Sequence, residues 1–304
     1  MRKMRIRTIF SILLFAASAA SAHAADSDGV LKIGITLHPY YSFVANIVGG
    51  RAEVIPLINA ESNPHGYSPQ PDDMRRASEM DVMVVNGIGH DEWAFEIIEA
   101  AGRKDDLPLI YANNSVALLP VGGDQELVVN AHTFVSITSA VQQVYEIARG
   151  LGEIDPDNAL FYRENAQAYG TRLRRLRANY MTRFSKLDTS SFKSATMHGA
   201  YDYMMQEFGL SVAAVIEPRH GVNPTARQLA RTIDEINAAD VNVLFAEAYF
   251  GSRLADTILE ATGVKVYSFS HIDAGPYTPE RFEEEMQANL DTLAEAIEST
   301  IALE

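Results

Sequence analysis

Short apolar runs and amphipathic stretches alternate along most of this chain. Before residue 112, strand-like runs lie at 31–37, 53–58, 81–85 and 107–111, and stretches with helical spacing lie between them at 41–48, 72–79 and 92–101. Gly49 and Gly50 are placed to end the first of these helices. Strands that alternate with helices predict a parallel sheet with helices on both faces.

The pattern changes between residues 135 and 187, where apolar positions recur only at helical spacing. One break lies at 150–155, and Pro156 stands in a helix-opening position. From 156 to 186 the single glycine is Gly170, and no further proline occurs. We therefore predict one helix of about 30 residues, about 45 Å long, which would run along two lobes and join them.

The alternation returns after residue 187. Strand-like runs lie at 194–197, 211–216, 241–246 and 264–269, and helical stretches lie at 201–208, 225–238, 253–261 and 280–299. For the last helix we expect Thr278 as the N-cap and Pro279 at the first helical position. The sequence thus predicts an α/β protein of two lobes, each a parallel sheet flanked by helices, joined by one long spine helix. The expected parts are an N-terminal lobe at 25–134, the helical spine at 135–187 and a C-terminal lobe at 188–304.

Residues 1–24 have the pattern of a signal peptide. A basic segment with Arg2, Lys3, Arg5 and Arg7 precedes an apolar run at 9–17, and Ala22-His23-Ala24 supplies small residues around a cleavage point. We expect export and a mature chain that starts at Ala25. The apolar run is shorter than the roughly 20 residues that a membrane-spanning helix needs.

The sequence contains no cysteine. A lipoprotein anchor requires a cysteine at the cleavage point, so we expect a protein that is free in the periplasm and carries no lipid anchor. Without thiolates, a site for a transition metal must rely on imidazole and carboxylate ligands.

The charge balance is acidic. Removing the four cations of the signal segment from 25 Lys and Arg leaves 21 against 40 Asp and Glu, a net charge of −19. Such acidity disfavours nucleic acid and anionic lipid as partners and keeps the protein soluble.

Four histidines stand where a strand-like run gives way to a loop or a helix: His65, His132, His198 and His271. In open α/β sheets, ligands bind outside the carboxyl ends of the strands, so this placement favours one site between the lobes. Their wide separation in the sequence means that no two share a turn of helix. The sequence therefore predicts a mononuclear metal site whose ligands come from four distant loops.

Other polar residues are open to two interpretations. His90 follows a strand end and would line the site there, although N-capping by Asp91 explains the neighbouring acidic residues. Glu247 ends a strand on the same sheet edge, where its carboxylate would orient a metal-bound imidazole. We expect His38 to support the cleft from the first turn after a strand, and His220 to be a loop residue.

Several segments, in order, resemble the zinc- and manganese-binding receptors of bacterial ABC importers, the cluster A-I solute-binding proteins. The resemblance covers essentially the whole mature chain. The matching segments are NPHGYSPQP around His65, VVNGIGHDEW at 84–93, VNAHTF around His132, DPDNALFYRENAQAY at 155–169, TMHGAYDYMMQEFGL around His198 and VLFAEAYF around Glu247.

By this resemblance, His65, His132 and His198 correspond to three metal ligands. The fourth ligand of the family is commonly an aspartate after the last strand, where this chain has His271; we favour His271 and keep Asp273 as the alternative. Relatives of the manganese type carry a carboxylate at the position of His198. Three or four imidazoles favour Zn²⁺, and Mn²⁺ is the alternative ion.

The resemblance implies a periplasmic high-affinity receptor that delivers Zn²⁺ to an inner-membrane permease driven by a cytoplasmic ATPase. We expect a monomer and no enzymatic activity. Two other functions fit parts of the sequence. One is a zinc-dependent periplasmic hydrolase with three histidine ligands and Glu247 as general base, and the other is a receptor for a metal chelate, haem or siderophore.

Overall fold

The computed structural model describes residues 29–121, 128–217, 225–247 and 252–301. The predicted signal segment 1–24 and His220 lie outside the described residues. By its contacts, Leu31–Glu304 forms one compact unit, which contains all the secondary structure of the described residues.

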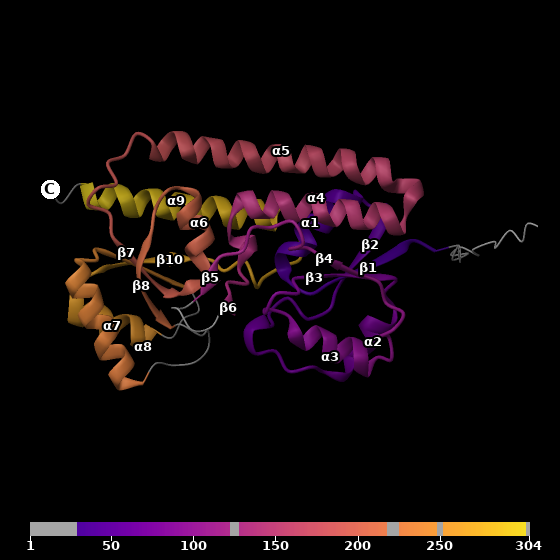
Figure 1. The fold of residues 1–304 in the computed structure, drawn as a ribbon, viewed down its shortest axis with the longest axis horizontal. Helices are drawn as coiled ribbons and strands as arrows, with labels where there is room; N and C mark the ends of the chain where they lie inside the picture. The colour runs from indigo at the N-terminus through magenta and orange to yellow at the C-terminus, as the bar shows by residue number, and fades with distance from the viewer. Residues whose placement is uncertain (1–28, 122–127, 218–224, 248–251, 302–304) are drawn as a thin grey trace, which may run out of the picture. The chain divides into compact units, whose positions relative to one another are not determined.

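The first sheet consists of four parallel strands in the order β2-β1-β3-β4 (Figure 1). They are β1 (Leu31–Ile35), β2 (Ala52–Pro56), β3 (Val82–Val85) and β4 (Leu109–Tyr111). All four coincide with predicted strands. β3 is buried along its whole length, as expected for a central strand covered on both faces.

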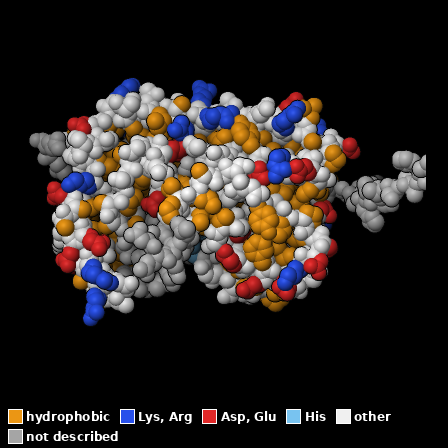
Figure 2. Space-filling view, in the orientation of Figure 1, with side chains coloured by type: hydrophobic (Ala, Val, Ile, Leu, Met, Phe, Trp, Pro, Cys, Tyr) orange, Lys and Arg blue, Asp and Glu red, His pale blue; other side chains and the backbone are white. Residues whose placement is uncertain are grey.

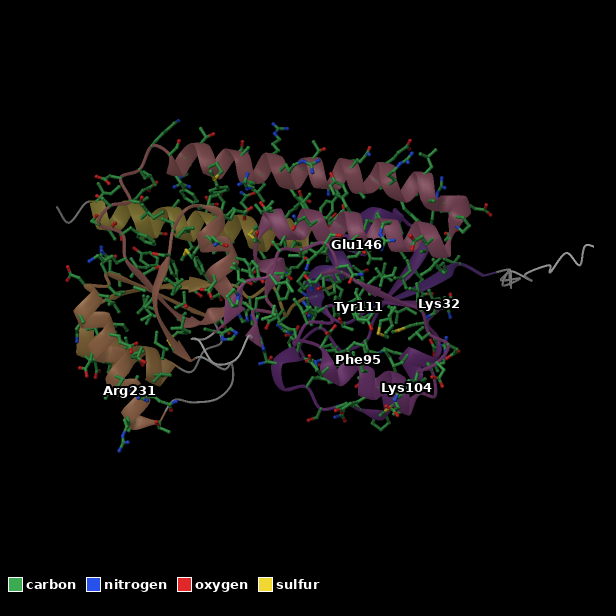
Figure 3. The ribbon with its side chains drawn as sticks, viewed as in Figure 1. Lys32, Phe95, Lys104, Tyr111, Glu146 and Arg231 are labelled. Atoms are coloured by element: carbon green, nitrogen blue, oxygen red, sulfur yellow. The ribbon has the colours of Figure 1, made fainter. Side chains whose placement is uncertain are left out.

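Helices cover both faces of this sheet (Figure 1). They are α1 (His38–Val48), α2 (Pro71–Ser78), α3 (Glu92–Ala100) and α4 (Ile137–Ile154). α1 ends as predicted, because Gly49 adopts the left-handed conformation with φ 52° and its N–H bonds to the carbonyl oxygen of Ala45. α4 lies over β4, and its Glu146 accepts a hydrogen bond from Ser115 in the loop after that strand (Figure 3).

A short antiparallel pair, β5 (Pro120–Val121) and β6 (Val128–Val129), was not predicted. Two-residue strands are too short to produce a periodic signal in the sequence. The pair leads directly to Asn130 and His132, so it fixes the position at which the chain enters the site.

The long spine helix is present, with a different first turn. Pro156–Asn158 forms a 3₁₀ turn (η3), and the α-helix proper, α5, runs over Ala159–Phe184, which is 26 residues. α5 packs along α4 and also contacts α1 and the last helix of the chain. In Figure 2, Lys and Arg side chains gather along the edge that α5 forms, in keeping with the six arginines in its sequence.

The second sheet also has four parallel strands, in the order β10-β9-β7-β8. They are β7 (Ser194–His198), β8 (Val212–Glu217), β9 (Val243–Glu247) and β10 (Lys265–Phe269). α6 (Asp202–Glu207) follows β7, and α7 (Ala226–Ala239) and α8 (Ser252–Thr262) cover the opposite side of the sheet (Figure 1). The predicted fold class, two parallel sheets flanked by helices and joined by a long helix, is confirmed.

The last helix, α9 (Arg281–Ile301), starts later than predicted. We expected Thr278 as N-cap and Pro279 at the first helical position, but residues 279–280 form a turn and the helix begins at Arg281. The backbone before α9 is instead held by α1: Ser42 donates to the carbonyl oxygen of Thr278 at 2.9 Å and Asn46 to that of Pro279 at 2.8 Å. These tertiary bonds replace the local cap that the sequence suggested.

One large apolar core joins the first sheet, α1, α4, α5 and α9, and a smaller core lies under α7 and α8. Phe43 of α1 and Phe282 of α9 meet edge to face in the large core, with ring centroids 4.8 Å apart. The spine and α9 therefore belong to both halves of the molecule. The division into lobes at 25–134 and 188–304 with a spine at 135–187 stays a prediction. Among the described residues, no helix is long and apolar enough to cross a membrane.

Candidate metal centre

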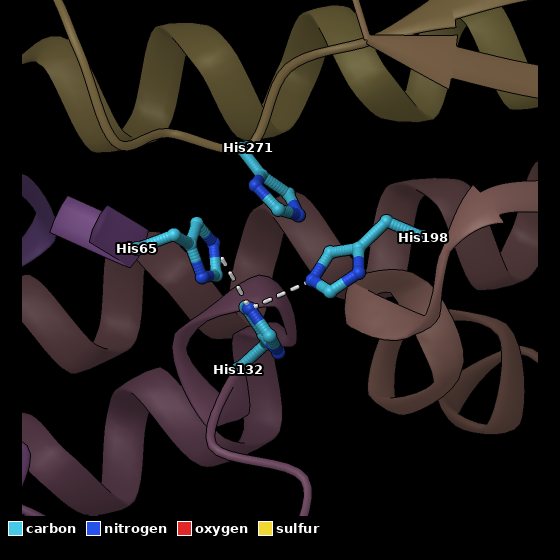
Figure 4. Close-up of side chains that lie close together, drawn as sticks. All are labelled: His65, His132, His198 and His271. Carbon is cyan, nitrogen blue, oxygen red and sulfur yellow. Dashed lines mark hydrogen bonds between the residues drawn. The ribbon is translucent and has the colours of Figure 1, made fainter. Parts of the chain in front are cut away.

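Four histidines from distant parts of the chain meet at one point (Figure 4). His65 lies in the 3₁₀ turn η1 (Pro64–Gly66), His132 follows β6, His198 ends β7, and His271 comes two residues after β10. Each offers one ring nitrogen, and these nitrogens all lie within 4.8 Å of one another. The structure thus brings together all four histidines that the sequence singled out.

The shortest contacts join nitrogens of three different loops. His132 Nε2 lies 3.3 Å from His65 Nε2 and 3.1 Å from His198 Nε2 (Figure 4). Two nitrogens bound to one tetrahedral ion at 2.0–2.1 Å would be about 3.3 Å apart. One ring nitrogen carries at most one proton, so a shared cation fits two such neighbours better than two hydrogen bonds do.

The ring positions fit the same geometry. A metal-bound imidazole has its centroid roughly 3.2 Å from the ion, so two rings at the tetrahedral angle lie about 5.2 Å apart. The six centroid distances among the four rings run from 4.7 Å for His132 and His198 to 5.4 Å for His65 and His271. The space between the rings therefore suits a bare ion.

His65 is held by its own turn. The side chain of Asn63 accepts a hydrogen bond from the His65 N–H at 2.9 Å, which caps the 3₁₀ turn. Trp93 of α3 donates its indole N–H to the carbonyl oxygen of Pro64 at 2.9 Å. The turn that carries His65 is thus capped by its own residue Asn63 and anchored to α3.

His132 is oriented by Asn130, a residue that the sequence analysis missed. The Nδ1–H of His132 donates to Asn130 Oδ1 at 2.9 Å, so the lone pair of Nε2 points toward the other rings. The Asn130 amide also donates to the carbonyl oxygen of Gly199, beside His198, at 2.7 Å. A metal-binding histidine usually needs such a partner on its second nitrogen, and the VNAH sequence carried this signal.

His271 lies between two carboxylates. Its Nδ1 is 3.6 Å from Asp273 Oδ2, and its Nε2 is 3.5 Å from Glu247 Oε1. Burial opposes protonation of His271, but Asp273 and Glu247 together raise its pKa. Burial raises the pKa of Glu247, and the pKa of Asp273 is lowered by His271 against the opposing effect of burial. Asp273, the alternative fourth ligand, is therefore placed beside His271 rather than in the group of four.

The interior of the site favours a neutral ring at His132. His132, His198 and His271 are 8%, 5% and 4% exposed. Burial, together with the neighbouring imidazoles, holds the pKa of His132 well below its usual value. A neutral imidazole at pH 7 keeps the lone pair that a metal needs.

Two further histidines lie near the group. His38 is stacked on Tyr277 with ring centroids 4.4 Å apart, its Nε2 bonds to the carbonyl oxygen of Ala60, and it is not part of the group of four. His90 lies beside the site, in agreement with one of its two interpretations: its ring centroid is 4.3 Å from that of His65. Asp91 occupies the N-cap position of α3, as predicted, but its carboxylate makes no cap bond to the helix and instead accepts from Thr36 and from the N–H groups of Asn86 and Gly87.

A family model matches residues 33–296, and its description is zinc-uptake complex component A, periplasmic. Among solved structures, FpvC from Pseudomonas aeruginosa in complex with Mn²⁺ is 50% identical, with a TM-score of 0.85, and covers 90% of this chain and 100% of its own. A structure of FpvC with Ni²⁺ has the same identity and a TM-score of 0.84, over 90% of this chain and 98% of its own.

Curated relatives are more distant and carry names for different metals. The manganese ABC transporter substrate-binding lipoprotein PsaA of Streptococcus pneumoniae is 23% identical over 94% of this chain and 96% of its own length. The zinc-binding lipoprotein AdcA of the same species is 26% identical over 81% of this chain and 51% of its own length.

Proposed function

Because the chain belongs to the family of zinc-uptake complex component A proteins, which are metal-binding receptors of ABC importers, we propose that it binds Zn²⁺ in the periplasm and delivers it to such an importer. The observation that carries this proposal is the convergence of four imidazoles, two from each half of the molecule, on one point. An ion bound there links the halves, which gives a membrane permease a difference to recognise between loaded and empty receptor.

The proposed ligands are His65, His132, His198 and His271, with Asp273 and Glu247 supporting the ring of His271. This choice rests on the ring nitrogens, which lie within 4.8 Å of one another in the group of four. With one nitrogen of His271 on the ion, the carboxylate beside the other nitrogen would accept its N–H, increase the basicity of the ring and fix its orientation.

Zinc is proposed because the ligand set contains only imidazole nitrogen. Mn²⁺ prefers oxygen ligands and stands lowest in the divalent series, whereas four nitrogens at tetrahedral spacing suit Zn²⁺. The relatives do not make this choice, since PsaA is named for manganese, AdcA for zinc, and FpvC has been solved with Mn²⁺ and Ni²⁺. Mn²⁺ is thus the alternative ion.

A receptor explains the site better than a hydrolase does. Four protein nitrogens fill a tetrahedral coordination sphere, so none of its positions is left for a water that Glu247 would activate. The spacing of the rings also suits a bare ion more than a chelate, which would need room for an organic ligand.

The ligand assignment can be tested by calorimetry on metal-free protein. We expect one Zn²⁺ per chain with submicromolar affinity in the wild type, and loss of this binding in His65→Ala, His132→Ala and His198→Ala. His38→Gln is the matched control, because His38 is buried nearby but bonds to a backbone carbonyl oxygen. Full stoichiometry and affinity in all three alanine variants would refute the site.

The choice of ion can be tested by competition. With both free ions buffered, we expect the wild type to bind Zn²⁺ at least about tenfold more tightly than Mn²⁺, as the divalent order predicts for nitrogen ligands. Equal or tighter binding of Mn²⁺ would replace zinc by the alternative ion and leave the receptor function intact.

The proposed location is the periplasm without a lipid anchor, in contrast to PsaA and AdcA, which are named lipoproteins. The absence of cysteine from the sequence supports this difference. The proposed partners are an inner-membrane permease and its cytoplasmic ATPase. Release of a monomer that begins at Ala25 on osmotic shock is the expected result; retention in the membrane fraction would contradict it.

A further inference from the structure

A fifth imidazole lies against the proposed site. The ring centroid of His90 is 4.3 Å from that of His65 and 4.8 Å from that of His132. His90 is 5% exposed and also meets Phe134 edge-on at 5.5 Å. It comes from the loop between β3 and α3, at the carboxyl edge of the first sheet.

The ring centroids of His90 and its two neighbours are as close together as those of ligands on one ion. Rings bound to a common ion at right angles have centroids about 4.5 Å apart, and at the tetrahedral angle about 5.2 Å apart, for metal–nitrogen bonds of 2.0–2.1 Å. The two distances from His90, 4.3 and 4.8 Å, lie near the right-angle value. The four rings of the proposed site lie nearer the tetrahedral value, with five of their six distances at 5.0–5.4 Å.

Buried hydrogen bonds to Asp91 fix the loop that carries His90. The buried carboxylate of Asp91 accepts from Asn86 N at 2.6 Å, Gly87 N at 2.9 Å and Thr36 Oγ1 at 2.6 Å. Gly89 precedes His90 with φ 111°, a conformation that other residues rarely adopt. The backbone is thus held in place for this ring, and a side chain attached to it approaches an ion by rotation about its own bonds.

We propose that His90 is a fifth nitrogen ligand of the bound ion, so that the loaded receptor has more than four protein donors. The proposal rests on the proposed function and refines it. The nitrogens of His90 lie outside the group of four, so the ring turns toward the ion on binding. Such a rotation needs no movement of the loop backbone.

The consequence is a different selectivity. A four-nitrogen tetrahedral site favours Zn²⁺, whereas a fifth donor improves the fit of ions that take five or six ligands, such as Mn²⁺. His90 therefore widens the range of ions that this receptor accepts. In the alternative role, His90 only packs against His65 and Phe134 and does not bind the ion.

Cobalt substitution distinguishes these roles. Co²⁺ absorbs strongly in the visible range when four ligands surround it tetrahedrally, and weakly when it has five or six. We expect weak bands in wild-type protein loaded with one Co²⁺, and strong bands in His90→Ala. His38→Gln, the matched control, should give the wild-type spectrum, and circular dichroism checks that each variant is folded.

Each result has a defined meaning. Strong tetrahedral bands in the wild type, or a weak spectrum that His90→Ala leaves unchanged, would exclude His90 as the fifth ligand while the receptor function stands. Failure of the wild type to bind one equivalent of Co²⁺ or Zn²⁺ would instead remove the proposed function itself.

Relative affinities supply a second measurement. In His90→Ala, we expect the affinity for Mn²⁺ to fall at least about tenfold more than the affinity for Zn²⁺, at the lower end of what the loss of a partner of a metal site costs. The variant His90→Asn retains a donor of similar reach and should recover part of the Mn²⁺ affinity. If His90 only packs against its neighbours, the affinities for Mn²⁺ and Zn²⁺ should change equally.

Discussion

Asn130 sets the chemistry of His132 although it does not itself touch the proposed ion. Its side-chain oxygen takes the Nδ1 proton of His132, and its amide group donates to the backbone beside His198. One residue therefore fixes the tautomer of one ligand and the distance to another. Asn130 is 2% exposed, so solvent cannot replace these bonds.

Replacing Asn130 by alanine should weaken Zn²⁺ binding about 10- to 100-fold, the usual cost of losing the hydrogen-bond partner of a metal-bound histidine. The measurement is calorimetric titration of metal-free protein. Asn165→Ala is the control, because Asn165 also donates to a backbone carbonyl oxygen but lies in the spine. Unchanged affinity in Asn130→Ala would mean that His132 needs no orienting partner.

Protonation of His132 should make the metal-free protein less stable in acid. Burial first, and then the nearby imidazoles, lower its pKa in the folded state, so the unfolded state binds more protons below the unfolded pKa of about 6.5. The stability of wild type therefore falls as pH drops through that range, by at most about 1.4 kcal/mol per pH unit for one such group. The raised pKa of His271 acts in the opposite direction.

Urea unfolding at pH 7.5 and 5.5 tests this expectation. His132→Asn should show a smaller loss of unfolding free energy between the two values than wild type does. A loss of equal size in both proteins would show that other groups cause the acid sensitivity.

At the scale of elements, the loop between β3 and α3 depends on a carboxylate inside it. Asp91 is fully buried and accepts three hydrogen bonds, two of them from backbone N–H groups of the same loop. Burial raises the pKa of this carboxyl. The loop is therefore a rigid platform for His90, and its shape does not depend on the capping of α3.

Replacing Asp91 by alanine should lower the unfolding free energy by about 2–4 kcal/mol, because two backbone donors lose their buried acceptor. Asp72→Ala is the control: Asp72 is 57% exposed and paired only at the surface, so we expect a change within about 1 kcal/mol. Thermal or urea unfolding measures both. A change in Asp91→Ala no larger than that in Asp72→Ala would contradict the proposed role.

Most of the helices and strands could be predicted from the sequence. The strands of both sheets are short apolar runs, and Gly49 ends α1 where its flexibility suggested. One misplaced end lies where tertiary bonds replace a local signal. α9 begins at Arg281 because Ser42 and Asn46 of α1 donate hydrogen bonds to the carbonyl oxygens of residues 278 and 279.

At the scale of the whole molecule, the proposed ion would cross-link two halves that already share an apolar core. His65 and His132 belong to the first half and His198 and His271 to the second. An ion that binds the folded state alone stabilises it in proportion to the logarithm of its concentration.

The free energy of unfolding should therefore rise as Zn²⁺ is added, by about 2.7 kcal/mol when the concentration of free Zn²⁺ is 100 times its dissociation constant. The measurement is urea unfolding with buffered Zn²⁺, compared with the metal-free protein. His132→Ala should show no such gain at the same free Zn²⁺. A gain in that variant equal to the wild-type gain would place the stabilising ion elsewhere.

The βα alternation, the long helix and the four histidines at strand ends could be predicted from the sequence, because the apolar periodicity that marks each helix and strand is local along the chain. Which other residues join the four histidines depends on the tertiary structure. Asn130 was missed, and the interpretations of His90 and Glu247 stayed open, because their places depend on contacts between segments far apart in sequence, and a single sequence does not record the distances between such segments.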